Sequence, residues 1–235
     1  MIDFHAHILP SVDDGSKSVD ESLKLLEMLT AQGVESVLAT SHYYADRESP
    51  QSFLERRATA YDALKPFLDS KCPEILLGAE VRFYDGISRL SELCSLRIEN
   101  TKLLLLEMPF ARWTEYTVKE LCELSCSNEL VVVLAHIERY LNMQDRGVFE
   151  YLREHGVLMQ VNASFFADLL SRRKALRMLK SGLIDALGSD CHNTHVRRPR
   201  INEAINVIKR NFGDTFVDDF AEYSKALLQK YSINN

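Results

Sequence analysis

Short apolar runs alternate along this 235-residue chain with longer stretches in which apolar residues recur at the period of a helix. The short runs predict buried strands at residues 1–5, 36–40, 75–79, 102–107, 130–135, 157–161 and 184–188. The periodic stretches predict helices at residues 51–68, 114–127, 146–155, 168–181 and 200–210. Another helix is predicted to begin after the capping box Ser18-x-x-Glu21.

About seven strand–helix units in series predict a parallel α/β sheet. No composition break or linker divides the chain, so we expect a single domain with a closed or nearly closed barrel over about residues 1–212. An open doubly wound sheet is the alternative, but it would normally carry a glycine-rich turn after its first strand, where this chain has His-Ala-His. Residues 214–231 predict a terminal amphipathic helix that packs on the outside.

Composition narrows the range of functions. A net charge of −6 and a pI of about 5.7 argue against a general binder of nucleic acid or membrane surfaces. The five cysteines are scattered and odd in number, which predicts neither a disulfide framework nor a zinc ribbon. No apolar run is long enough to cross a bilayer and no leader pattern is present, so we expect a soluble, cytoplasmic protein. The oligomeric state is not indicated.

Histidines and carboxylates stand at the ends of the predicted strands. In an α/β barrel the carboxyl ends of the strands converge on one rim, so these residues can meet in one pocket. Alternate residues of an extended segment face the same side, and a carboxylate at the end of a buried strand is costly unless it is paired or binds a cation. The positions therefore predict a metal site built from His5, His7, His42, Glu80, Glu107, His136, Asp190 and His192.

Imidazole and carboxylate ligands together fit manganese, iron or zinc. A set of this size could hold two or three divalent ions, with Glu80 as a bridge. Two ions about 3.5–4 Å apart clamp a phosphoryl group and lower the pKa of water. The alternative is a structural cluster of hydrogen-bonded histidines and salt-bridged glutamates, which is the better interpretation for any one member but not for the whole set.

Several motifs resemble a known family. Residues 5–15 read His-x-His-x-Leu-Pro-x-x-Asp-Asp-Gly, residues 107–109 read Glu-Met-Pro, and residues 135–139 read Ala-His-Ile-Glu-Arg. From residue 1 to about 199 the chain resembles the polymerase and histidinol phosphatase (PHP) superfamily. Within it, the chain most resembles the manganese-dependent protein-tyrosine phosphatases of bacterial capsule and exopolysaccharide systems, the CpsB/YwqE type. The resemblance implies a distorted, TIM-like (β/α)7 barrel with a trinuclear centre, which agrees with the strand count.

The resemblance also implies how the ligands are shared. The first ion would be held by His5, His7, Glu80 and Asp190; the second by Glu80, Glu107 and His136; the third by His42, His192 and one carboxylate of the pair Asp13 and Asp14. We favour Asp14 as that ligand. Asp13 is then expected to orient a ligand or to serve as an acid.

Two arginines are expected to bind the phosphate, because a guanidinium matches phosphate oxygens and stays charged. Arg139 follows His136 by one short turn. Arg197 matches the phosphate-binding arginine of the family, although the usual Arg-Pro reads here as residues 197–200, Arg-Arg-Pro-Arg. Either Arg197 or Arg198 could therefore reach the phosphate.

We expect a metal-dependent phosphomonoesterase that acts on phosphotyrosine in proteins. The resemblance implies a partner, an autophosphorylating bacterial tyrosine kinase of polysaccharide export. One alternative is a phosphatase of histidinol phosphate or another small molecule. An alternative of another class is a metal-stabilised module that binds phosphotyrosine without cleaving it, which the arginines argue against because structural metal sites are closed.

A second chemical route is suggested by Cys191 and Arg197, which have the Cys-x5-Arg spacing of Cys-dependent tyrosine phosphatases. Those loops carry glycine so that backbone amides can converge on the anion, whereas this loop has none. The neighbouring Asp190 would raise the thiol pKa, which opposes nucleophilic attack. We interpret the spacing as a coincidence.

Overall fold

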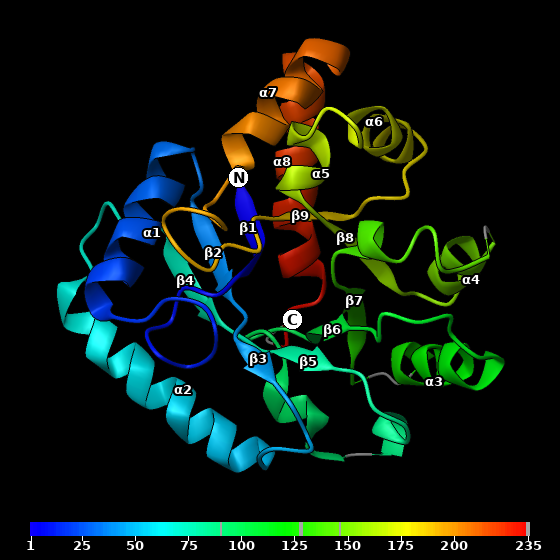
Figure 1. Ribbon diagram of the computed structural model, residues 1–235, viewed down its shortest axis with the longest axis horizontal. Helices are drawn as coiled ribbons and strands as arrows, with labels where there is room; N and C mark the ends of the chain where they lie inside the picture. Colours follow the sequence, from blue (N-terminus) through cyan, green and yellow to red (C-terminus); the bar gives the residue numbers. More distant parts are fainter. Residues whose placement is uncertain (90, 127–128, 146, 234–235) are drawn as a thin grey trace.

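The strands of this protein curl into a barrel of parallel strands (Figure 1). The computed structural model describes residues 1–89, 91–126, 129–145 and 147–233. One sheet has the order β1–β2–β4, and the other has the order β3–β5–β6–β7–β8–β9. The bounds are β1 Ile2–Ala6, β2 Ser36–Ala39, β3 His42–Tyr43, β4 Glu74–Leu77, β5 Glu80–Arg82, β6 Leu103–Glu107, β7 Val131–Leu134, β8 Leu158–Asn162 and β9 Ala186–Gly188.

All seven predicted strands are confirmed, and two short strands were not predicted. β3 follows β2, and β5 follows β4, each after a break of two residues. At the second break Gly78 packs closely against Ile98, because an added Cβ would lie 2.3 Å from Cδ1 at the end of that side chain. Each pair of strands occupies one place in the barrel, and the described strands therefore fill the seven places expected of a distorted (β/α)7 barrel.

The barrel closes where β9 meets β1. Ala6 and Cys191 form a parallel bridge, with hydrogen bonds from Asp190 N–H to His5 O at 2.7 Å and from His7 N–H to Cys191 O at 2.9 Å. Nearer the amino end of β1, the carboxylate of Asp3 accepts the N–H groups of Ser189 and His5. We call this junction between β1 and residues 189–191 the seam. It lies at the carboxyl ends of the strands.

Helices surround the barrel, with α1 and α2 on one side and α3 and α4 on the other (Figure 1). The predicted capping of the first helix is confirmed, because Ser18 Oγ accepts the N–H of Glu21 at 3.2 Å. Among the described residues, no helix combines the length and apolar character needed to cross a membrane. The bounds are α1 Val19–Ala31, α2 Pro50–Leu64, α3 Glu115–Cys126, α4 Val148–Glu154, α6 Arg172–Lys180 and α7 Ile201–Phe212.

The helix predicted at 168–181 is wrong at its start. Residues 168–171 form a turn, and α6 begins at Arg172. An unpredicted helix, α5 (Ala163–Ala167), precedes that turn, because Phe165 and Phe166 bury their rings in the main core and the helix packs on α7. The predicted end of a helix at residue 127 and the start of another at 146 lie outside the described residues.

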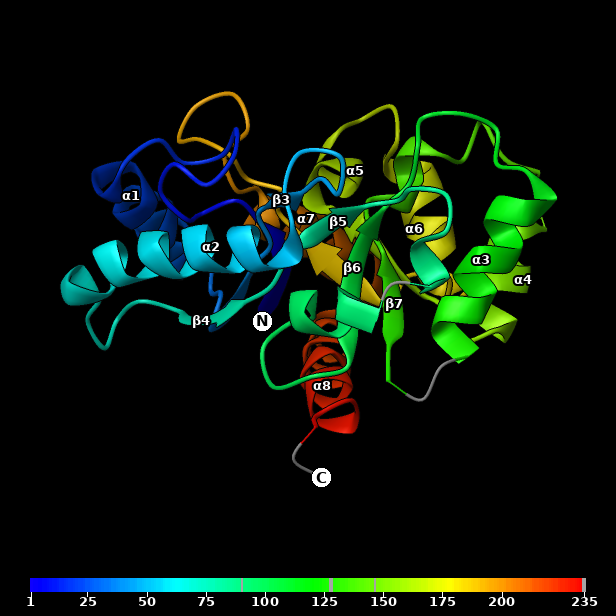
Figure 2. The ribbon, with the colours of Figure 1, turned by 90° about the horizontal axis from the view of Figure 1, so that it is seen from below.

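The C-terminal helix α8 (Asp214–Lys230) lies below the strands instead of in the outer ring (Figure 2). Its Leu227 is buried in the apolar cluster formed by barrel-interior residues such as Phe4 and Leu105. Tyr231 O then accepts the N–H of Lys102 at 2.8 Å. The expectation that this helix packs on the outside is therefore wrong, because the apolar lower interior of the barrel needs a cover and α8 supplies it.

Candidate metal centre

The predicted metal ligands meet at the rim where the strands reach their carboxyl ends. A bulge in β1 between Asp3 and Ala6 allows His5 to face the interior although its neighbour Phe4 also packs inside. Asp14 is 63% exposed, and His42 and Glu107 are partly buried. The other predicted ligands are fully buried: His5, His7, Glu80, His136, Asp190 and His192.

Glu80, the first residue of β5, lies at the centre of the rim. Its Oε2 is 3.2 Å from His5 Nε2 and 3.0 Å from His42 Nδ1, and its Oε1 is 2.9 Å from His136 Nε2. Burial opposes ionisation of this carboxyl, but the facing imidazoles, His5 first, hold the pKa of Glu80 well below its usual range. A carboxylate with both oxygens surrounded by metal-ligand nitrogens is suited to bridge two ions.

Several buried polar atoms at the rim form no hydrogen bond of suitable geometry with any described residue, namely Glu80 Oε2, His42 Nδ1 and His192 Nε2, although the first two lie 3.0 Å apart. His5 Nε2 and His7 Nε2 also face each other at 3.0 Å. A buried polar atom left unpaired costs about 1–3 kcal/mol, so a set of them in one space indicates a ligand. Imidazole nitrogens with carboxylate oxygens fit a divalent manganese, iron or zinc ion.

The donor atoms fall into overlapping groups, and within each group the atoms lie within 4.8 Å of one another. Burial and the nearby charge of Glu80 raise the pKa of Glu107, a repulsion that a cation between the two carboxyls would remove. Glu107 and His136, predicted to share one ion with Glu80, fall in different groups. The described residues form four groups. They are His5, His7 and Asp190; His5, Glu80 and His136; His42, Glu80 and Glu107; and His7, Asp14, His42 and His192.

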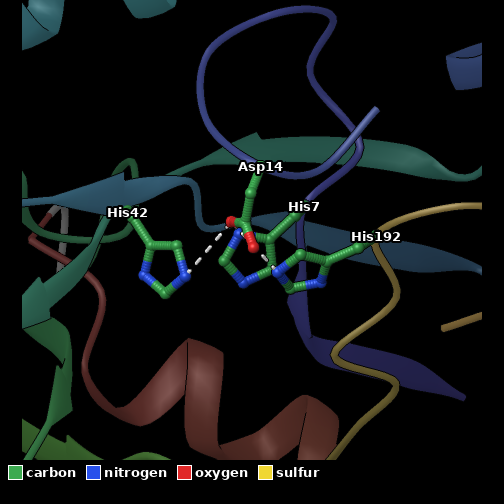
Figure 3. Close-up of side chains that lie close together, drawn as sticks. All are labelled: His7, Asp14, His42 and His192. Atoms are coloured by element: carbon green, nitrogen blue, oxygen red, sulfur yellow. Dashed lines mark ion pairs between the residues drawn. The ribbon is translucent and has the colours of Figure 1, made fainter. Parts of the chain in front are cut away.

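Figure 3 shows the group that contains Asp14. Asp14 Oδ1 lies 3.5 Å from His42 Nε2 and 3.4 Å from His192 Nε2. The loop after β1 folds back over the rim at Gly15, where an added Cβ would lie 2.4 Å from His7 O. The close approach of this loop requires glycine and brings Asp14 to the histidines.

Asp13 occupies a different place and holds a ligand. Its Oδ2 accepts from His7 Nδ1 at 2.7 Å and from His42 N–H at 2.8 Å, and its Oδ1 accepts from Gly15 N–H. Burial opposes ionisation, but the His7 ring and the two backbone donors hold the pKa of Asp13 below its usual range. With Nδ1 of His7 bonded to Asp13, Nε2 is the nitrogen that faces the metal groups.

Two of the ligands hold backbone conformations that are rare for residues other than glycine. The φ angle is 35° at His136 and 52° at Asp190. Such conformations cost about 1–3 kcal/mol each and concentrate at functional sites. At His136 the turn after β7 carries the imidazole to Glu80, and at Asp190 the chain bends into the seam.

A cavity of about 230 Å³ opens beside the ligands, and Arg139 and Arg197 line it. Arg139 pairs with Asp190 Oδ2, and Arg197 Nη2 lies 2.8 Å from Asp190 Oδ1. Both guanidiniums are partly exposed, so a substrate can reach them. Arg198 pairs instead with Glu203 at 2.8 Å, so the structure places Arg197 and not Arg198 at the cavity.

Tyr44 and Arg82 line the same cavity and were not predicted. Tyr44 stands two residues after His42, and Arg82 stands two residues after Glu80. Because alternate residues of a strand share a face, this spacing is the sequence signal that could have identified them.

Two buried side-chain amides on β8, those of Gln160 and Asn162, were also not predicted from the sequence. Gln160 Oε1 accepts the backbone N–H of His136 at 2.7 Å and faces His5 Nδ1 at 3.3 Å. Gln160 Nε2 donates to Asn162 Oδ1 at 3.0 Å, and Asn162 Nδ2 donates to Asp190 Oδ2 at 2.8 Å. Because Gln160 Oε1 can only accept, the proton of neutral His5 is on Nδ1 and its Nε2 is free for a metal.

Cys191 is fully buried at the seam. Burial, together with the nearby carboxylate of Asp3, raises the pKa of the Cys191 thiol. A nucleophilic cysteine needs a lowered pKa and access to substrate. The structure therefore agrees with the interpretation of the Cys-x5-Arg spacing as a coincidence.

Comparison with known proteins places this geometry in context. Residues 1–229 match the family described as "Capsular polysaccharide synthesis, CpsB/CapC". The chain is 32% identical over 252 residues to the tyrosine-protein phosphatase CpsB of Streptococcus agalactiae, covering 99% of this chain and 100% of that protein. It is 27% identical over 239 residues to the tyrosine-protein phosphatase YwqE of Bacillus subtilis, covering 99% and 93%.

Solved structures also match the fold of this chain. The crystal structures of YwqE from Bacillus subtilis and CpsB from Streptococcus pneumoniae, described as unique metal-dependent tyrosine phosphatases, include a chain that matches this fold with a TM-score of 0.84. That match has 25% sequence identity and covers 99% of this chain and 96% of the other.

Proposed function

Because this chain belongs to the CpsB/CapC family of capsular polysaccharide synthesis, we propose that it is a metal-dependent phosphatase that hydrolyses phosphotyrosine in proteins. One observation carries the proposal. Metal-ligand residues from six barrel strands and the loops that follow them meet at one rim, and four of them, His42, Glu80, Glu107 and Asp190, line a cavity that two arginines also line. Such an arrangement suits a phosphoryl group, which needs cations around its oxygens.

The metal ligands and the residues that orient them have different roles at the rim. A divalent centre supplies a lowered pKa for water and positive charge for the phosphoryl group. Asp13 and Gln160 orient the imidazoles of His7 and His5, and so hold their Nε2 atoms toward the centre. The residues that would hold the ions are His5, His7, Asp14, His42, Glu80, Glu107, His136, Asp190 and His192.

Arg139 and Arg197 bind the phosphate in this proposal. They come from different loops, the turn after β7 and the segment after β9, and both guanidiniums lie at the cavity. Each can donate to phosphoryl oxygens and neutralise charge that develops in the transition state. We assign Asp13 to positioning and not to acid catalysis, because its carboxylate already accepts from three donors.

The leaving group fits this set of residues. Tyrosinate, with a parent pKa near 10, leaves more readily than a serine alkoxide, so the reaction depends less on a general acid. We further propose that Mn²⁺ fills the centre, and that the substrate is an autophosphorylating bacterial tyrosine kinase of polysaccharide export met in the cytoplasm. The mixed nitrogen and oxygen donors support the metal, and the family's role in capsule synthesis supports the partner.

The test is phosphate release from a phosphotyrosine peptide, measured for the protein as purified, after chelation, and after Mn²⁺ is restored. We expect activity to be lost and then recovered, and to exceed the activity on a phosphoserine peptide and on histidinol phosphate. Faster hydrolysis of histidinol phosphate would contradict the assigned substrate. Activity that survives chelation but is lost to thiol alkylation would contradict the metal mechanism.

A further inference from the structure

A second cavity of about 570 Å³ adjoins the metal cavity and shares Tyr44 and Arg82 with it. β3 and β5 are parallel neighbours with His42 opposite Glu80. Arg82 is the last residue of β5 and Tyr44 directly follows β3, so each lies two residues beyond one of these ligands. A substrate whose phosphate reaches the metal cavity therefore passes directly beside the second cavity.

Two guanidiniums flank the Tyr44 ring in this second cavity. Arg47 Cζ lies 4.3 Å from the ring centroid and Arg82 Cζ lies 5.7 Å from it, within the range of cation–π contacts. Arg47 is held by a turn in which its N–H donates to Tyr44 O at 3.0 Å. The turn fixes the backbone of Arg47, and the cation–π contacts place both guanidiniums against the Tyr44 ring.

Arg47 and Arg82 are less neutralised than the two arginines of the metal cavity, although the charge of Arg82 also acts on Glu107. Within the part of the chain that the structure describes, neither Arg47 nor Arg82 forms an ion pair, whereas Arg139 and Arg197 both rest on Asp190. The lining of the second cavity contains one carboxylate, Asp46, so its two guanidiniums leave a net positive wall. This local charge is opposite to the net charge of −6 on the whole chain.

A further polar group in the wall lacks a partner. The hydroxyl of Tyr84 is buried and forms no hydrogen bond with any described residue. A buried hydroxyl without a partner is uncommon. The second cavity therefore combines two cations and an aromatic face, and Tyr84 also lines it.

We propose that Tyr44, Arg47, Arg82 and Tyr84 form a subsite for an anionic side chain that neighbours the phosphotyrosine in the same substrate protein. The inference rests on the proposed phosphatase function and defines its substrate class. The anion is a carboxylate of aspartate or glutamate, or a second phosphoryl group, because both match the fork of a guanidinium.

The experiment compares peptides that share one phosphotyrosine and differ only in a neighbouring side chain, placed in turn at each of the flanking positions. One set carries glutamate, a second carries glutamine, and a third carries another phosphorylated residue. We measure kcat/KM for wild-type protein, Arg47→Ala and Arg47→Lys, with p-nitrophenyl phosphate as a substrate too small to reach the subsite. Arg210→Ala, an exposed arginine of α7, controls for the change in net charge.

We expect wild-type protein to favour an anionic neighbour over glutamine by about threefold to tenfold at one or more positions, the range of a charged hydrogen bond at a partly exposed site. Arg47→Ala should lose this preference, Arg47→Lys should keep part of it, and neither should change the rate with p-nitrophenyl phosphate. The glutamate and phosphorylated sets show which anion the subsite prefers.

Two results would overturn the subsite while leaving the phosphatase function intact. They are equal rates for anionic and neutral peptides in wild-type protein, or a preference that Arg47→Ala retains. Failure to hydrolyse any phosphotyrosine peptide would instead overturn the proposed function, and the subsite with it.

Discussion

Gln160 gives the sharpest test of how the metal centre is held. The substitution Gln160→Met keeps a long, unbranched side chain in a fully buried position but removes every hydrogen bond of the amide. The shortest of these bonds, from His136 N–H at 2.7 Å, would leave a buried donor without an acceptor. That change costs about 1–3 kcal/mol of the free energy of unfolding.

The same substitution should weaken metal binding. His5 loses the acceptor at 3.3 Å that keeps its proton on Nδ1, and Asn162 loses the donor that turns its own Nδ2 toward Asp190. Loss of such partners of metal ligands lowers affinity about 10–100-fold, which equals about 1.4–2.7 kcal/mol.

The assay is calorimetric titration of chelator-stripped protein with Mn²⁺, paired with denaturant unfolding of the same samples. Gln51→Met on the exposed face of α2 is a matched control and should leave both quantities at wild-type values. Wild-type Mn²⁺ affinity in Gln160→Met, together with a folded protein, would refute the role given to the β8 amides.

Three further predictions concern the catalytic site. Glu80→Ala should abolish turnover and leave the far-ultraviolet circular dichroism unchanged, since Glu80 belongs to two of the ligand groups; wild-type turnover would contradict its assignment. Arg139→Ala should lower kcat/KM for a phosphotyrosine peptide about 10–100-fold, whereas Arg198→Ala, which pairs away from the cavity, should leave it unchanged; equal effects would remove Arg139 from the site. Cys191→Ser should keep the chelator-sensitive activity of the wild type, and an inactive but folded variant would restore the thiol route.

Strand positions and ligands could be predicted from the sequence because both depend on short-range signals. Buried parallel strands read as uninterrupted apolar runs, and their carboxyl ends must share one rim. A charged residue placed there, such as Glu80 after residues 75–79, is informative because its burial demands a partner.

Other features depend on contacts that no local pattern contains. Asp13 and Asp14 are chemically equivalent neighbours, and only the path of the loop at Gly15 separates the ligand position from the orienting one. Gln160 and Asn162 look like ordinary polar interruptions of an apolar strand until their partners on β1 and in the segments after β7 and β9 are known. The cover that α8 provides likewise follows from the shape of the barrel and not from its own amphipathic pattern.

An ion bound by His5, His7 and Asp190 would link the first strand of the barrel to the segment after its last strand. His5 and His7 lie on one side of the seam and Asp190 on the other, so one ion would tie together the two segments that already bond at Ala6 and Cys191. A ligand that binds only the closed form stabilises it by about 2.7 kcal/mol at one hundred times its dissociation constant. During synthesis the group is incomplete until residue 190 has left the ribosome. The chain can therefore bind an ion tightly at this group only when its synthesis is nearly complete.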